Sequence, residues 1–200
     1  MRGAIARLAA CLSSVTSRQK CLEEGFAASV NVVVALTPYP HLVMIERSVR
    51  SDDPWSGDMA FPGGRKKAGE DTIRVAAREA EEEVCLSRGC YEVIGCMDPE
   101  APLSRPSLRV VPVVSLLRAP ECLPRVPCSP EATRVALVPV PARLESMLVN
   151  ALHPVRGLVI KAYKDWYGNY VWGLSLRIME KIADRLYECW LEAMEVCRLA

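Results

Sequence analysis

The chain has 200 residues, half of them apolar, and carries 25 basic against 24 acidic side chains, a formal net charge of +1. This length and apolar content allow one sizeable core and predict a single domain over residues 1–200. The near-neutral charge argues against a general nucleic-acid or membrane-surface binder, and no apolar run approaches the roughly 20 residues that a membrane-spanning helix needs.

The opening residues predict a helix that ends near Ser13-Ser14. Met1–Leu8 also has the arginines and small residues of a transit peptide, but it lacks the long apolar centre of a secretory signal. We interpret the segment as the first helix of the domain and expect a cytoplasmic protein.

Two β-branched, apolar runs come next, at Ser29–Leu36 and His41–Ile45. The turn residues Thr37–Pro40 between them predict a hairpin. A loop rich in proline, glycine and aspartate then covers Ser51–Gly64 and leads to a helix expected at Thr72–Val84.

The rest of the chain alternates between short strands and helices. We expect strands at Tyr91–Met97, Leu108–Leu117 and Thr133–Val138, a short helix near Pro141–Leu148, strand pieces at Val155–Tyr163 and Trp166–Tyr170, and a long helix from about Leu174 to near the end. Because the order lacks strict βαβ regularity, it predicts an α/β fold with a mixed sheet covered by helices on both faces.

Acidic residues gather on one face of the helix expected at Thr72–Val84. Glu79, Glu82 and Glu83 stand at helical offsets of 0, +3 and +4, so their side chains project together. Such like charges are tolerated most easily when a cation occupies the face, and oxygen ligands suit Mg²⁺ or Mn²⁺. The alternative is a solvated acidic helix paired with its own arginines.

The segment before the helix favours the metal site. Phe61–Gly64 is a rigid bend that lets the backbone come close to the acidic face. Counted from Gly64, the chain reads Gly-x5-Glu-x7-Arg-Glu-x2-Glu-Glu, which resembles the Nudix box, Gly-x5-Glu-x7-Arg-Glu-U-x-Glu-Glu-x-Gly-U with U aliphatic. Cys85 replaces the last glycine, so we expect either mild strain there or a helix cap shifted toward Arg88-Gly89.

The resemblance implies a Nudix-like α/β/α sandwich and a metal-dependent diphosphatase. Nudix-like enzymes hydrolyse a nucleoside diphosphate linked to another group, with Mg²⁺ or Mn²⁺ as cofactor. The residue-by-residue match gives the expected metal ligands as Glu79, Glu83, Glu82 and the carbonyl of Gly63. Arg78 and Glu70 match a pair that orients these carboxylates.

The base that activates the water is less closely defined by the resemblance, because it often lies outside the box. Glu131, just before the strand expected at Thr133–Val138, is the first candidate, and Glu100 is the second. Glu82 of the box is a further alternative. The expected catalytic residues are therefore Glu70, Arg78, Glu82, Glu83 and Glu131.

Upstream residues point to a substrate class. Arg47-Ser48 and Gly57–Gly64 resemble a motif of the coenzyme A diphosphatase branch, although the second arginine of that motif is missing from its place. Coenzyme A or a derivative is therefore the leading substrate, with ADP-ribose, NADH or nucleoside triphosphates as alternatives and a non-catalytic ligand-sensing domain as a third reading. The resemblance also makes a homodimer possible.

Several side chains could bind such a substrate. Arg47 and Arg65 are candidates for the phosphates, through charge-assisted pairs. Trp55, beside the bend, is a candidate for stacking on a nucleobase. Tyr170 and Trp172 lead into the last helix, and we expect them in the core.

Nine cysteines are present, and none forms a C-x-x-C pair. Their spacing argues against a zinc site. We expect buried free thiols, with the intracellular disulfides of hyperthermophiles as the alternative.

Overall fold

A computed structural model describes residues 2–13, 16–22, 25–51, 53, 55–153 and 155–198. Its regular elements are α1 (Arg2–Leu12), β1 (Ala28–Leu36), β2 (Pro40–Arg47), β3 (Met59–Ala60), β4 (Gly63–Arg65), α2 (Thr72–Val84), β5 (Tyr91–Cys96), β6 (Val110–Leu117), β7 (Ala132–Pro139), β8 (Leu148–Leu152), β9 (Val159–Lys164), β10 (Tyr170–Trp172) and α3 (Gly173–Arg198). Short 3-10 turns lie at Gln19–Leu22, Arg88–Cys90, Pro120–Cys122 and Glu145–Met147. The first helix ends close to its predicted end, although Ser14 lies outside the described residues.

The main sheet has seven strands and a fork that shapes the site. Its path runs β3-β2-β1-β6-β5, with β7 on β2 and β4 on β1. Only β1 and β6 run parallel, so the sheet is mixed, as predicted. The hairpin strands β1 and β2 pair around Val34 and Leu42 and then separate. In the gap, β4 pairs with β1 and β3 with β2, which places the Phe61–Gly64 bend inside the fork.

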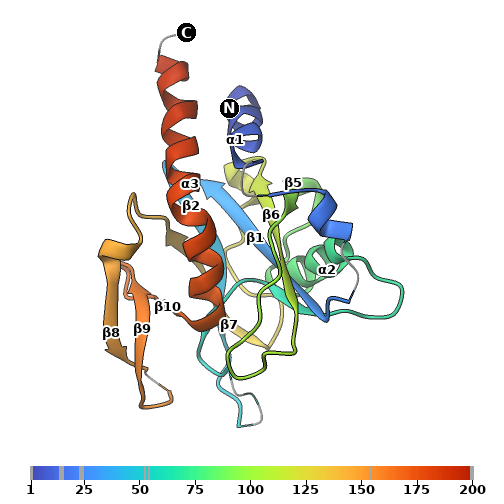
Figure 1. Ribbon diagram of the computed structural model, residues 1–200, viewed down its shortest axis with the longest axis vertical. Helices are drawn as coiled ribbons and strands as arrows, with labels where there is room; N and C mark the ends of the chain where they lie inside the picture. The colour runs from blue at the N-terminus through green and yellow to red at the C-terminus, as the bar shows by residue number, and fades with distance from the viewer. Residues whose placement is uncertain are drawn as a thin grey trace.

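Helices cover both faces of this sheet (Figure 1). Successive residues of a strand point to opposite faces, and both β1 and β2 carry buried apolar residues on each face. Val32, Val34, Leu42 and Met44 pack toward α1 and α3, whereas Val33, Ala35, Val43 and Ile45 pack toward α2. The predicted α/β/α sandwich with a mixed sheet is therefore confirmed.

A separate antiparallel sheet of β8, β9 and β10 leads into α3. Two local predictions are wrong here. The helix expected near 141–148 is only the 3-10 turn Glu145–Met147, and Leu148–Leu152 forms a strand. The strand piece expected at Trp166–Tyr170 begins as a turn, because the Asp165 carboxylate accepts the N–H groups of Tyr167 and Asn169. Among the described residues, no helix has the length and hydropathy needed to cross a membrane.

The cysteines overturn the expectation of free thiols. Three disulfides form, Cys11–Cys189, Cys21–Cys96 and Cys85–Cys128, with sequence separations of 178, 75 and 43 residues. Cys90 and Cys122 are free, and the side chain of Cys197 lies outside the described part. Partners this far apart are brought together by tertiary structure, so spacing along the chain gave no sign of them.

Candidate active site

The box helix α2 begins and ends at defined caps. At its start the Asp71 carboxylate accepts the backbone N–H of Arg74 at 2.8 Å. At its end Cys85 adopts φ 53°, the left-handed conformation that the family's glycine would adopt. Of the two sequence-based alternatives, strain at Cys85 is therefore the correct one, and the cap does not shift to Arg88-Gly89.

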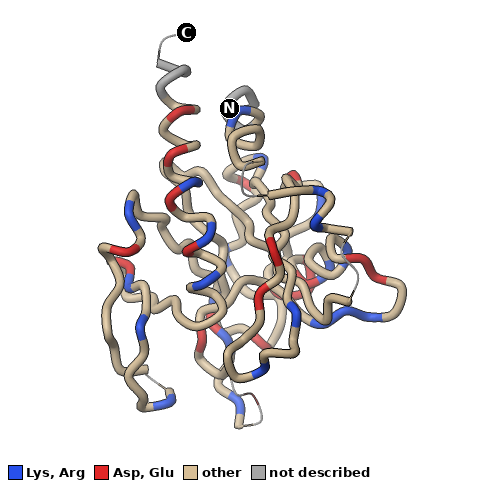
Figure 2. Tube along the Cα trace, viewed as in Figure 1, with Lys and Arg blue, Asp and Glu red and all other residues tan. Residues whose placement is uncertain are grey.

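A cavity of about 780 Å³ opens beside the fork of the main sheet. Almost every site residue expected from the sequence lines it: Arg47, Trp55, Gly63, Arg65, Arg78, Glu79, Glu82, Glu83 and Glu131. Basic residues also come from the β4–α2 loop, from the β8–β9 loop and from α3. Acidic and basic side chains are otherwise interspersed along the trace (Figure 2), in keeping with the net charge of +1.

Arg78 orders the acidic face. Its Nε and Nη2 donate to both oxygens of Glu70, at 2.7 and 3.1 Å, and its Nη1 donates to Glu79 at 2.6 Å and Glu82 at 3.0 Å. A guanidinium fork is suited to this geometry because its donors lie in one plane. The hydrogen bonds from Arg78 lower the pKa of Glu70 to about 2, and the pair raises the pKa of Arg78 in return. Glu70, although outside the cavity lining, therefore fixes the residue that holds two box glutamates.

Glu83 is the most deeply buried of the box carboxylates, with 4 % of its surface exposed. Burial raises the pKa of Glu83 to about 8, and the negative charge of the neighbouring Glu79 raises it further. The hydrogen bond from the Gly63 N–H, at 2.8 Å, acts in the opposite direction and lowers this pKa. Burial also raises the pKa of Glu79, despite its ion pair with Arg78. Adjacent buried carboxylates are costly to ionise unless a cation compensates them.

The backbone bend lies directly against these carboxylates. A Cβ atom placed on Gly64 would stand 2.1 Å from Oε1 of Glu79, and one on Gly63 would stand 2.5 Å from the side chain of Val30. At Gly63 a methyl group would also meet the backbone oxygen of Ser29 at 2.7 Å, whereas at Gly64 it would displace the end of the Glu79 side chain. The close approach inferred from Phe61–Gly64 is thus present.

The donor chemistry fits a hard divalent cation. Glu79, Glu82 and Glu83 offer only oxygen atoms, and the amide of Gly63 lies beside Glu83. Within the described ranges no three His, Cys, Asp or Glu side chains stand together as a ready-made metal cage. The carboxylates of Glu79 and Glu82 are both turned toward Arg78.

The three residues expected to bind substrate all line the cavity, but they differ in their contacts with other side chains. Arg47 is engaged by Asp53, whose carboxylate accepts Nε at 3.0 Å and Nη2 at 2.7 Å. The guanidinium of Arg105 lies over the ring of Trp55, 4.8 Å from its centroid. The Trp55–Arg105 contact brings two loops together at the cavity, and Arg65 supplies a basic side chain beside them.

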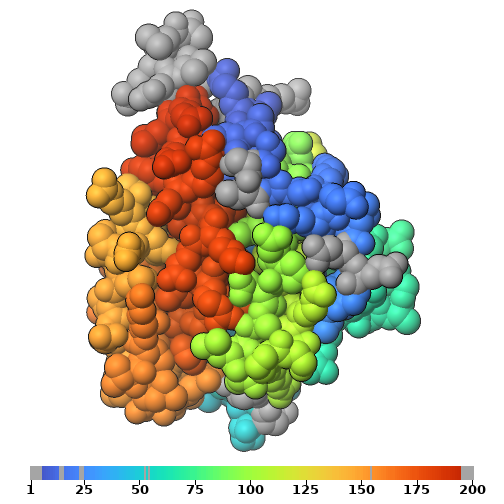
Figure 3. Space-filling view, viewed as in Figure 1, coloured from blue at the N-terminus to red at the C-terminus, as the bar shows by residue number. Residues whose placement is uncertain are grey.

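The two loop candidates for the base are not equivalent. Glu131 lines the cavity and its side chain is half exposed. Glu100 does not line it and forms ion pairs with Arg177 and Lys181 of α3. Burial alone would raise the pKa of Glu100, but the hydrogen bonds from these two cations lower it. Figure 3 shows this part of the chain, in light green, against α3, in red.

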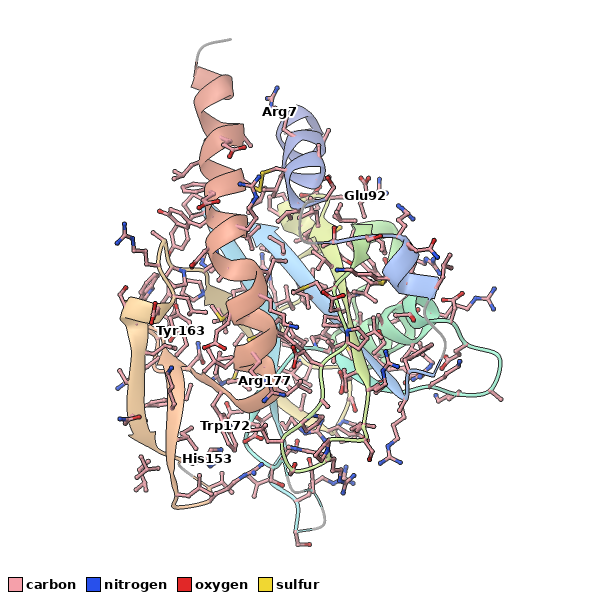
Figure 4. All side chains as sticks on the ribbon, viewed as in Figure 1. Arg7, Glu92, His153, Tyr163, Trp172 and Arg177 are labelled. Carbon is pink, nitrogen blue, oxygen red and sulfur yellow. A yellow bond between two sulfur atoms is a disulfide. The ribbon has the colours of Figure 1, made fainter. Side chains whose placement is uncertain are left out.

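Sequence reasoning missed a polar cluster on another wall of the cavity. The buried Asp58 accepts hydrogen bonds from His153 at 2.8 Å, Arg156 at 2.9 Å and Trp172 at 3.1 Å. Trp172, expected in the core, instead lines the cavity, at the same end of the molecule as His153 (Figure 4). Asp58 and His153 are 95 residues apart, so no local pattern indicated that they meet.

Comparison with known proteins decides the family. A model of the NUDIX domain matches residues 25–150, well over half of the chain. The chain belongs to the Nudix family. Its Nudix relatives include the uncharacterized Nudix hydrolase NudL of Escherichia coli O7:K1 and of Shigella boydii serotype 18, each 32 % identical over 165 residues, covering 78 % of this chain and 80 % of the relative.

Solved structures show the same fold. A MutT/nudix family protein from Enterococcus faecalis superposes with a TM-score of 0.50 at 15 % identity, over 84 % of this chain and 68 % of the other. At this identity the likeness speaks for the Nudix fold alone. The family model and the hydrolase relatives make this chain a Nudix-type pyrophosphohydrolase.

Proposed function

We propose that this Nudix enzyme hydrolyses the diphosphate of a nucleoside diphosphate linked to another group, with Mg²⁺ or Mn²⁺ as cofactor. The observation that carries the proposal is the shared cavity, where the carboxylates of α2 meet several basic side chains. Its volume of about 780 Å³ suits a nucleotide-sized ligand. A ligand-sensing domain would not need this complete acidic set, so hydrolysis is the better reading.

The proposed metal ligands are Glu79, Glu82, Glu83 and the carbonyl of Gly63. A bound divalent cation neutralises the diphosphate and lowers the pKa of the attacking water. Arg78, held by Glu70, keeps two of the carboxylates oriented.

Glu131 is the proposed acceptor of the proton from the attacking water. It lines the cavity, and its side chain has no ion pair closer than 3.9 Å, to Arg50, among the described residues. A carboxylate so placed can accept a proton, whereas Glu100 is held by two cations.

Coenzyme A or a derivative is the proposed leading substrate, with ADP-ribose, NADH and nucleoside triphosphates as alternatives. Arg47 and Arg65 would bind its phosphates and Trp55 its base, and all three line the cavity. The Arg47-Ser48 and Gly57–Gly64 segments support the coenzyme A assignment. Because the second arginine of the coenzyme A diphosphatase motif is missing, the alternative substrates are tested as well.

The test is phosphate-product release from coenzyme A, ADP-ribose, NADH and nucleoside triphosphates, with Mg²⁺ or Mn²⁺ and then with a chelator. The Glu83→Gln variant is assayed together with Glu81→Gln as its control. Glu81 is exposed, belongs to the same helix and does not line the cavity. We expect metal-dependent turnover of one compound, lost in Glu83→Gln and retained in Glu81→Gln. Binding of a compound by calorimetry without any turnover would contradict hydrolysis and favour ligand sensing.

A further inference from the structure

The Cys85–Cys128 disulfide joins the end of the box helix to the loop that carries Glu131. Cys85 follows Glu83 by two residues, and Cys128 precedes Glu131 by three. A hydrogen bond of 2.8 Å from the Cys128 N–H to the Glu83 carbonyl lies beside the covalent link. The helix that bears the carboxylates and the loop that bears the proposed base are therefore fastened together at one point.

The start of the loop is held by Arg118, whose N–H donates to the Cys90 carbonyl at 2.8 Å, and by Cys122 and Leu123, which pack on the core beside α2. Between β6 and β7 the chain forms only the 3-10 turn Pro120–Cys122, and residues 118–131 include four prolines. Near Glu131 the loop is held by Ser48, which donates its hydroxyl to the Pro130 carbonyl at 2.7 Å and its N–H to the Glu131 carbonyl at 2.8 Å. Ser129 and Glu131 both line the cavity. The paired strand β7, which begins at Ala132, and Ser48 hold this segment on one side, and the disulfide holds it on the other.

This disulfide is also the most accessible one. Cys85 and Cys128 are both exposed. In contrast, Cys21 and Cys96 are buried, with 5 % and 0 % exposed, and Cys189 of the third disulfide is 1 % exposed. Because exchange requires a thiolate to reach a sulfur atom, a reductant attacks Cys85–Cys128 first.

We propose that Cys85 and Cys128 are positioning residues whose disulfide holds Glu131 and Ser129 against the box carboxylates, so that its reduction lowers turnover. The inference rests on the proposed function for its kinetic consequence. In the reductive step a dithiol supplies two electrons and two protons. The protein S–S bond is replaced by two thiols, and the dithiol closes to its own disulfide.

The position of Cys85 makes a sharp variant available. A side chain at φ 53° is disfavoured, and glycine adopts that conformation without a steric penalty. Cys85→Gly combined with Cys128→Ser therefore removes the tether while improving the helix cap. Any loss of activity in this double variant cannot come from a weakened end of α2.

The kinetic experiment compares the oxidised protein, the protein after mild dithiol treatment, and the double variant, on the compound that the wild type hydrolyses. Alkylation and mass spectrometry establish that Cys85 and Cys128 alone have been reduced. We expect kcat to fall about tenfold or more, with KM within about twofold, in both untethered forms, since misplacing a reacting group costs rate rather than binding. Reoxidation of the wild type restores kcat, and a Cys11→Ser, Cys189→Ser control retains it.

Hydrogen exchange supplies a readout that needs no activity. In the untethered forms the amides of residues 126–132 should exchange at least about tenfold faster, because the Cys128 N–H loses its fixed carbonyl acceptor. Unchanged exchange, or unchanged kcat after verified reduction, would overturn the inference. If no compound is hydrolysed in any state, the proposed function fails, and hydrogen exchange alone then decides whether the tether orders the loop.

Discussion

At the residue scale, Gly64 is where backbone and carboxylate come closest. Gly64→Ala would place a methyl group 2.1 Å from Oε1 of Glu79, so the carboxylate must move away from its present position. We expect Mn²⁺ affinity, measured by calorimetric titration, to fall about tenfold or more. Gly89→Ala is the matched control, because its Cβ would meet no atom within 4 Å. Equal affinities in the two variants would show that Glu79 does not bind the metal.

Glu70 provides a pH-dependent prediction at the same scale. Its pKa falls from 4.5 to about 2 on folding, so its ion pair with Arg78 stabilises the protein fully above about pH 4.5 and loses this effect as pH falls toward 2. Glu70→Gln should therefore cost about 1–3 kcal/mol of unfolding free energy at pH 6 and progressively less at pH 4 and 3. Urea unfolding at these three pH values measures the difference. A pH-independent cost, or a similar trend in the exposed Glu92→Gln, would contradict this assignment.

At the element scale, Asp58 forms one of the links between the second sheet and the main body. Asp58→Ala would leave the donors of His153, Arg156 and Trp172 without their acceptor, at a cost of about 3 kcal/mol or more in unfolding free energy. Since two of these three partners line the cavity, KM should rise more than kcat falls. Denaturant unfolding and steady-state kinetics test both parts. Asp98→Ala, which removes an exposed ion pair with Lys20, should change neither.

The elements that sequence reasoning located share a strong local signal. The hairpin of β1 and β2 has β-branched runs around a proline turn, and α2 has its cap and its periodic small residues. The strand Leu148–Leu152 has no such signal, because its side chains are partly or fully exposed and its stability comes from pairing with β9. Arg78 and the glutamates were found for the same local reason, since one helix fixes their spacing.

At the scale of the whole molecule, long-range contacts lie beyond what spacing can show. Asp58 meets His153 only because the β8–β9 loop returns to the main sheet, and Cys85 meets Cys128 only because the β6–β7 loop passes the end of α2. A side chain's neighbours across 40 to 180 residues depend on the completed fold. The acidic face and several side chains around it were therefore predictable from one sequence, whereas the Asp58 cluster and the disulfides were not.

The disulfide Cys11–Cys189 spans nearly the whole described chain, linking α1 to α3 over 178 residues. Closing so long a loop lowers the entropy of the unfolded chain, which adds at most about 5 kcal/mol to the free energy of unfolding in the chain-entropy model. We expect Cys11→Ser with Cys189→Ser to lower the unfolding free energy by about 2–4 kcal/mol, seen as a lower Tm and urea midpoint.

The same variant should leave kcat and KM unchanged. Only the first turns of α3 line the cavity, and Cys189 lies 12 residues beyond Arg177, about 18 Å along the helix. The main sheet and the apolar face of α3, including Met179, Ile182 and Leu186, continue to hold the helix in place. A loss of kcat at temperatures well below the lowered Tm would mean that the α1–α3 link also orders the cavity. Unchanged turnover with lower stability would assign this disulfide to stability and leave Cys85–Cys128 as the one that acts on the site.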